Sequence, residues 1–189
     1  MTTRSKVKLP NIRKTPKRTA YERDRLKVSK APTIGDLDRI VDSFPKIKKL
    51  VSSLTKTAGE LDAVKRQIYY TKDPEGSNGS TLVEDEQNLR YIRFMHGFLG
   101  IASELAECHA GFTKDGELKP MENPLEELGD IRWYLGEMID AFGLTMKQVE
   151  DANIAKLAKR YPGLNFSSEA AQEENRDREA EKAELEKAV

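Results

Sequence analysis

The sequence predicts an all-α protein whose main module resembles a four-helix bundle. Three observations predict this class. Apolar residues recur at three- and four-residue steps in four segments, residues that start or stop helices stand between these segments, and no stretch shows the alternation of a strand. Short connections between successive helices favour antiparallel neighbours, which is the arrangement of a bundle.

The first two predicted helices are long. The first begins after Pro45, because a proline is well tolerated at the start of a helix. Its apolar stripe consists of Ile47, Leu50, Val51, Leu54, Ala58, Leu61, Val64 and Ile68. A loop is predicted at 74–80, and the next helix runs from Asp85 to Ala110. Because this second helix is apolar on several sides, we expect it to be central in the bundle.

The third and fourth predicted helices have clear boundaries. After a predicted loop at 111–122, Asn123 is an N-cap candidate, and Pro124 stands at the first helical position. The expected buried stripe of this helix is Leu128, Ile131, Leu135, Met138 and Phe142, and Gly143 ends it. Thr145 and Gln148 then form a capping box for the last helix. That helix ends at Tyr161, because Pro162 cannot continue it.

The charged residues are segregated along the chain. The 189 residues contain 32 basic and 32 acidic side chains, but residues 1–30 carry eleven bases against two acids. Residues 168–189 carry eight acids and four bases. We therefore expect a basic and disordered arm over 1–33, an all-α domain over 34–166 and a charged tail over 167–189 that is helical or disordered. No apolar run is long enough to span a membrane, and the single cysteine excludes a disulfide framework.

Two pairs of acidic residues with a spacing of three stand on the second and third helices. They are Glu104 with Glu107 and Glu127 with Asp130, and each pair shares one face of its helix. Carboxylates that meet inside a bundle cannot all stay ionised without a partner, and a divalent cation resolves the conflict. All-oxygen ligands favour Mg²⁺ or Mn²⁺. Spacing alone is weak support, because acidic residues make up about one position in six of the chain.

Two glycines precede Glu104 on nearly the same stripe. A glycine inside a helix costs about 1 kcal/mol relative to alanine, so Gly97 and Gly100 indicate a close approach at this place. A ligand and a closely packed neighbouring helix are both open as the cause.

Three ordered blocks resemble the all-α nucleoside triphosphate pyrophosphohydrolase superfamily, the MazG-like group of bacterial and phage proteins. The signature of that group is Glu-x-x-Glu, a spacer of variable length, and Glu-x-x-Asp. Here the blocks are GIASELAE from Gly100, PLEELGDIRWYL from Pro124 and NIAKLAKRYP from Asn153, with nineteen residues between the two acidic motifs. The resemblance covers about residues 88–166, and KRQIYYTKDPE at 65–75 is similar, more weakly, to a lead-in of phage-type members.

The resemblance implies hydrolysis of a nucleoside or deoxynucleoside triphosphate to the monophosphate and pyrophosphate, with Mg²⁺ or Mn²⁺ as the cofactor. It assigns catalysis and metal ligation to Glu104, Glu107, Glu127 and Asp130. Asn153, Lys156 and Arg160 form one stripe of the last helix and are the expected contacts to sugar and phosphates. Tyr134, which stands seven residues after Glu127, is expected to border the nucleotide. A solvated face of the last helix is the alternative for the first three residues, and an ordinary core position is the alternative for Tyr134.

Two further classes of protein compete with this interpretation. A di-iron carboxylate bundle needs Glu-x-x-His motifs, but Arg93 and Ala106 occupy the places three residues before His96 and His109. A helical interaction protein that binds nucleic acid or an acidic partner through the basic arm remains open. We expect a homodimer or homotetramer, because a module of this size leaves apolar helix faces uncovered. We also expect a cytoplasmic protein with no membrane contact.

Overall fold

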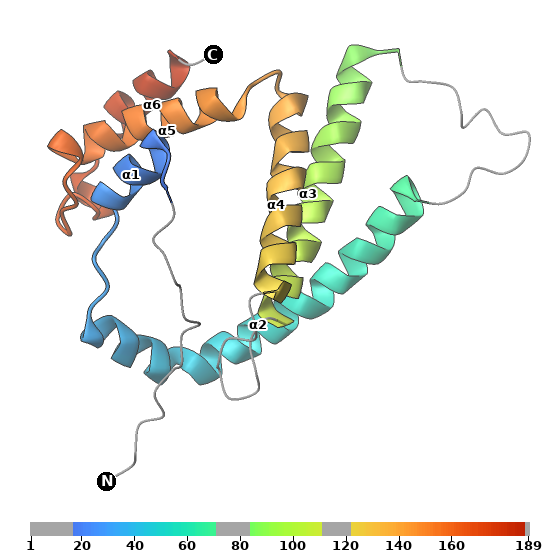
Figure 1. The fold of residues 1–189 in the computed structure, drawn as a ribbon, viewed down its shortest axis with the longest axis horizontal. Coiled ribbons are helices and arrows are strands. Elements are labelled where there is room, and N and C mark those ends of the chain that lie inside the picture. Colours follow the sequence, from blue (N-terminus) through green and yellow to red (C-terminus); the bar gives the residue numbers. More distant parts are fainter. Residues whose placement is uncertain (1–16, 71–83, 111–121, 188–189) are drawn as a thin grey trace, which may run out of the picture. The chain divides into compact units, whose positions relative to one another are not determined.

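A computed structural model describes residues 17–70, 84–110 and 122–187, and within these ranges all regular structure is helical (Figure 1). The predicted all-α class is therefore confirmed. None of the described helices combines the length and the apolar character that a membrane crossing requires. The predicted loop at 74–80, nearly all of the loop at 111–122 and the first sixteen residues of the predicted arm lie outside the described residues.

The described residues divide into two compact units. The first unit comprises 43–70, 84–110 and 122–143, and the second comprises 17–42 and 144–187. This division differs from the predicted single domain over 34–166, because the last predicted helix belongs to the second unit. The four-helix bundle is accordingly not confirmed.

An antiparallel pair of helices forms the centre of the first unit. These are α3 (Glu86–Ala110) and α4 (Glu122–Ala141), which lie side by side in Figure 1. The predicted start of the first of these, Asp85, is right to within one residue. Helix α4 begins before the predicted N-cap, so Asn123 lies in its first turn. Gly143 follows the end of α4 with a φ of 67°, as predicted for a glycine that ends a helix.

Gly97 and Gly100 allow α3 and α4 to approach closely. A Cβ atom at Gly97 would lie 2.5 Å from Met138 Cγ and 2.6 Å from the carbonyl oxygen of Tyr134. A Cβ atom at Gly100 would overlap the ring of Tyr134. A neighbouring helix is therefore what comes close at the two glycines, which is the second of the two expected causes.

The apolar stripe predicted for α4 is only partly buried. Leu128 and Phe142 are 59% and 61% exposed, so the prediction was wrong for these two residues. The contact face of α4 is rotated from the expected one and carries Glu127, Tyr134, Ile139 and Ala141 as its buried side chains. Helix α3 also keeps large apolar side chains exposed on one side, among them Leu105 at 51%.

Helix α2 (Ile34–Tyr69) is longer than predicted, because it runs through Pro45 instead of starting after it. The sequence before the proline repeats apolar residues at helical steps, at Ile34, Leu37, Val41 and Phe44. Proline removes one backbone hydrogen bond from a helix, and the turns on both sides here continue regardless. The C-terminal part of α2 contacts α3, where the hydroxyl of Tyr69 donates a 2.9 Å hydrogen bond to the carbonyl oxygen of Ile92.

Helix α5 (Met146–Arg160) is the central helix of the second unit and has the boundaries that the sequence predicts. Thr145 Oγ1 accepts a hydrogen bond from the Gln148 backbone N–H, and Gln148 Oε1 accepts one from the Thr145 backbone N–H. The predicted capping box is thus confirmed. Helix α5 ends at Arg160, one residue before Tyr161, and the short 3₁₀ helix η2 (Pro162–Leu164) follows it.

The segments predicted as arm and tail both contain helices that pack on α5. Helix α1 (Ala20–Lys27) begins with a capping box of Thr19 and Glu22, so the prediction of disorder was wrong for this part of 1–33. The 3₁₀ helix η3 (Glu173–Asn175) and helix α6 (Arg178–Glu186) lie in the predicted tail.

Helix α6 is held to α5 by a buried ion-pair cluster. Arg160 Nε and Nη2 donate hydrogen bonds of 2.9 and 2.7 Å to the carboxylate of Glu181, and Arg176 donates two more. These bonds, from Arg160 first and then from Arg176, hold the pKa of Glu181 far below its ordinary value. A helix that is polar on all sides therefore packs here through charge instead of apolar contact.

The close approach of α3 and α4 predicts that Gly100→Ala destabilises the first unit. The added methyl group must displace the Tyr134 ring, and overpacking of this kind costs about 1–3 kcal/mol. Gly129→Ala is the matched control, because a Cβ atom at this α4 position meets no atom within 4 Å. The control should stabilise the protein by roughly 0.5–1 kcal/mol through helix propensity. Urea unfolding followed by circular dichroism measures both changes, and equal stability of the two variants would contradict the packing account.

Candidate metal centre

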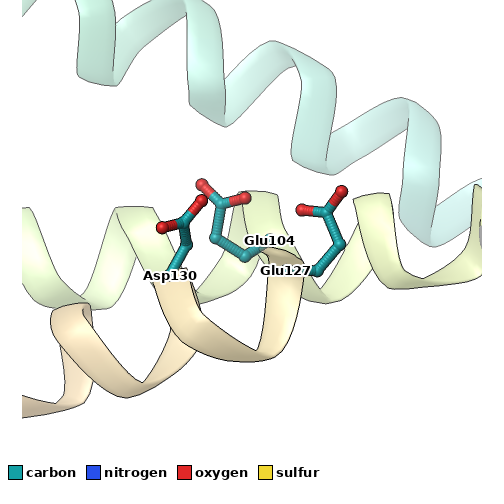
Figure 2. A group of neighbouring side chains, drawn as sticks. All are labelled: Glu104, Glu127 and Asp130. Carbon is teal, nitrogen blue, oxygen red and sulfur yellow. The ribbon is translucent and has the colours of Figure 1, made fainter. Parts of the chain in front are cut away.

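Three acidic side chains from α3 and α4 converge at one place in the first unit. Glu104, Glu127 and Asp130 each place one carboxylate oxygen so that the three oxygens lie within 4.8 Å of one another. Figure 2 shows the three carboxylates on the side of the α3–α4 pair along which the ribbon of α2 passes. Glu104 of the first predicted pair therefore meets both members of the second pair across the interface of the two helices.

The contact between Gly100 and Tyr134 sets the register that brings these acids together. In an antiparallel helix pair, four residues forward on one helix correspond to four residues back on the other. Glu104 follows Gly100 by four residues, and Asp130 precedes Tyr134 by four, so the two acids stand at the same level. Glu127 is one further turn back along α4 and stays on the same face.

The two glutamates of this group are buried and the aspartate is not. Glu104 and Glu127 are 7% and 6% exposed, whereas Asp130 is exposed to solvent. Burial raises the pKa of Glu127 above its ordinary value, and the charges of Glu107 and Glu104 raise it further. The fold therefore keeps a carboxylate in a place where its negative charge is disfavoured unless a cation is near.

Glu107, the fourth predicted ligand, lies outside the group of three converging oxygens. Burial is the main cause that raises the pKa of Glu107, and the charges of Glu104 and Asp62 raise it further. Glu107 therefore still interacts electrostatically with these acids. Asp62 of α2 was not among the predicted site residues. The structure thus brings together three of the four predicted ligands and adds a further acid from α2 to their surroundings.

The converging oxygens fit a divalent cation. Two oxygens on opposite sides of Mg²⁺ lie about 4.2 Å apart, and those across Ca²⁺ lie about 5 Å apart, which is twice the usual metal–oxygen distance. The separations of up to 4.8 Å among Glu104, Glu127 and Asp130 lie within the span across Ca²⁺ and exceed that across Mg²⁺ by a few tenths of an ångström, which a small side-chain movement closes. The donor set is entirely carboxylate oxygen, which is the kind that hard cations such as Mg²⁺ and Mn²⁺ prefer.

Sequence reasoning missed Lys65, a buried lysine of α2 that reaches this cluster. Its Nζ lies 2.9 Å from Ser103 Oγ, 3.0 Å from Asp62 Oδ1 and 3.5 Å from Glu104 Oε1. Burial lowers the pKa of Lys65, but hydrogen bonds with Asp62 and Tyr134 outweigh this effect and raise the net value. A charged residue seven positions after the buried Ala58 was the available signal, because it stands on the buried face of the helix.

Tyr134 is buried in the first unit, and its hydroxyl belongs to a chain of polar groups. Lys65 Nζ donates to this hydroxyl at 3.2 Å, and the hydroxyl lies 3.4 Å from that of Tyr70. The Tyr70 hydroxyl is in turn 3.1 Å from His96 Nε2. The His96 ring also stacks on the Tyr69 ring, with 4.2 Å between the ring centroids. Both the Nε2 atom and the plane of the imidazole ring therefore have partners. The ring of Tyr134 is packed against Gly100, which matches the core alternative for this residue more closely than an open place beside a ligand.

The three expected phosphate and sugar contacts lie in the second unit. Asn153 Oδ1 accepts a 3.5 Å hydrogen bond from the hydroxyl of Tyr21, and Lys156 is half-buried. Arg160 is engaged with Glu181, so its guanidinium already serves α6. The structure therefore assigns a structural role to Arg160, and its predicted role in substrate binding stays untested.

The raised pKa of Glu127 predicts that Glu127→Gln stabilises the metal-free protein at pH 7. The native state binds the Glu127 proton more strongly than the unfolded chain, so the wild type loses stability as the pH rises above about 4.5. Glutamine carries no charge and escapes this loss. Urea unfolding in a chelator at pH 5 and pH 7 should show the advantage of the variant growing with pH. If the wild type is more stable than Glu127→Gln at pH 7, the prediction is wrong, and nearby cations already compensate the charge of Glu127.

No family model matches this chain, and no curated protein or solved structure matches it. The resemblance of the acidic motifs to the pyrophosphohydrolase superfamily thus stays a prediction, beside the observed convergence of their carboxylates.

Proposed function

We propose that this chain is a metal-dependent pyrophosphohydrolase, which hydrolyses a nucleoside or deoxynucleoside triphosphate to the monophosphate and pyrophosphate. The convergence of Glu104, Glu127 and Asp130 within 4.8 Å carries the proposal. Spacing alone gave weak support, because acidic pairs are common in this chain. Three acids that meet across a helix interface, with two of the carboxylates buried, are much harder to attribute to a solvated surface.

The carboxylates of Glu104, Glu127 and Asp130 would hold the cofactor, which we propose to be Mg²⁺ or Mn²⁺. Bound there, a divalent ion supplies Lewis acidity toward phosphate oxygens and lowers the pKa of a coordinated water. The chain itself supplies position, because the packed α3–α4 pair fixes the direction of each carboxylate. We assign to Glu107, whose pKa is raised by burial and by the charge of Glu104, the acceptance of a proton from the attacking water or a place as a further ligand.

The family resemblance supports the assignment of substrate and product. Such a reaction belongs in the cytoplasm, where nucleoside triphosphates are held. The alternative of an interaction protein rests on the exposed bases of 17–30, among them Arg18, Arg23 and Arg25. That alternative gives no reason for acids to converge in the first unit, so we rank it second.

Hydrolysis is tested with the purified full-length chain, Mg²⁺ and a panel of the common ribonucleoside and deoxynucleoside triphosphates. We expect at least one of them to give pyrophosphate and the monophosphate. Ion-exchange chromatography measures both products. Glu104→Gln and Asp130→Asn should each lower kcat/KM by about 100-fold or more, as the loss of an electrostatic stabiliser does.

Asp140→Asn is the matched control for these variants. Asp140 is an exposed aspartate of the same helix, and the substitution is chemically identical to Asp130→Asn. Its activity should equal that of the wild type. Release of orthophosphate in place of pyrophosphate would contradict the reaction, and a folded protein that hydrolyses none of the panel would favour the interaction protein.

We further propose that the chain acts as a homodimer or homotetramer. Large apolar side chains of α3 and α4 are exposed in the isolated chain, including Phe98, Leu105, Leu128 and Phe142. Large apolar side chains that are exposed in one chain are often covered by another copy at a subunit interface. Light scattering of the purified protein should give two or four times the chain mass of 21.4 kDa. A mass of one chain at micromolar concentration would contradict this proposal.

A further inference from the structure

Lys65 brings a fixed positive charge from α2 to the edge of the carboxylate cluster. The side chain is buried, and four acceptor groups surround its Nζ: Ser103 Oγ, Asp62 Oδ1, the Tyr134 hydroxyl and Glu104 Oε1. Ser103 Oγ donates its own proton to the carbonyl oxygen of Gly100 at 2.8 Å, so it is available to Lys65 as an acceptor. These partners on three helices hold the ammonium in one place.

The cations of α2 lie on one side of the cluster. Lys65 and the neighbouring Arg66 both form ion pairs with Asp62, at 3.0 and 2.6 Å. Lys65 also lies near Glu104 Oε1, whereas Glu127 and Asp130 approach Glu104 from α4. Glu104 is thus shared between an ammonium on the α2 side and the group that fits a divalent cation on the α4 side.

A divalent cation that uses Glu104 as a ligand would stand close to this ammonium. Two positive charges a few ångström apart in a partly buried place repel each other strongly, because little water screens them. The ammonium cannot withdraw, since its burial and its contacts to Ser103 and Tyr134 hold it. Its charge therefore opposes every divalent ion that enters the cluster, and a second ion is opposed by the charge of the first ion as well.

We propose that Lys65 is a positioning residue that limits the cluster to one divalent cation and sets a moderate affinity for it. The proposal rests on the proposed function in one respect, which is that Glu104, Glu127 and Asp130 form a metal site. It concerns the charge of Lys65, and its test is metal binding by itself.

The experiment is a titration of the full-length chain with Mn²⁺, in which electron paramagnetic resonance measures the free ion. The wild type should bind one Mn²⁺ per chain. Lys65→Met, which keeps an unbranched side chain that is one atom shorter and removes its charge, should bind Mn²⁺ about tenfold more tightly or take up a second ion. The direction is decisive, because loss of a merely structural lysine would loosen the cluster and weaken binding.

Two further variants separate charge from shape. Lys65→Arg keeps the positive charge and should leave the stoichiometry and the affinity close to those of the wild type. Arg66→Met removes the next cation of α2, whose side chain is 69% exposed, and should change the affinity by less than about threefold because solvent screens it. Circular dichroism checks the fold of each variant, and Lys65→Gln replaces Lys65→Met if the latter does not fold.

Several outcomes would overturn the proposal: two ions bound to the wild type, no bound Mn²⁺, or unchanged or weaker binding in Lys65→Met and Lys65→Gln. The proposed function is tested separately, by the measurement of hydrolysis. Hydrolysis by a wild type that binds two ions would contradict the role of Lys65 alone. One bound ion and tighter binding in Lys65→Met, without hydrolysis of any triphosphate, would contradict the reaction alone.

Discussion

The close contact between α3 and α4 is the constraint on which the candidate site depends. Gly97 and Gly100 leave room for the backbone and the ring of Tyr134, and no residue with a Cβ atom would fit there without movement. This contact fixes both the distance between the helices and their register. The same register places Glu104 at the level of Asp130, so the packing that stabilises the pair also assembles its carboxylates.

The electrostatics of the first unit follow from that packing. Glu104 and Glu127 are buried because they stand on the face that α3 and α4 share, and not because acids favour such a place. Buried like charges destabilise a fold unless a cation offsets them. The chain provides part of the offset through Lys65, and the remaining negative charge is what makes a divalent ion a reasonable partner.

Local signals in the sequence were enough to predict much of the fold. The capping box of Thr145 and Gln148, the glycine after α4 and the bounds of α3 depend on neighbouring residues, and all of them were predicted correctly or nearly so. The face that a helix buries depends on its partner, which explains the errors at Leu128 and Phe142. Pro45 was mistaken for a boundary because proline disfavours a helix interior without excluding it.

The candidate site, like the fold, was predictable only where neighbouring residues in the sequence determine it. The acidic pairs follow from spacing on one helix, but the position of Glu107 outside the group depends on the side chains around it. The spacing from Ala58 placed Lys65 on the buried face of its helix, but its partners, and the part of Asp62, could be assigned only once α2 was known to cross the pair at their level. Helix α1 was missed, whereas a helix was one of the two predictions for the tail. Ion pairs such as Arg160–Glu181 hold α6, and such pairs leave no apolar pattern in the sequence.

The uneven burial of the three converging acids has a kinetic consequence. An ion that approaches from solvent meets Asp130 first, because Glu104 and Glu127 are shielded by the helices. Exchange of an ion can then proceed one ligand at a time from the open side, without separation of α3 from α4. In the metal site that we propose, the exchange of the ion would therefore be independent of the opening of the fold.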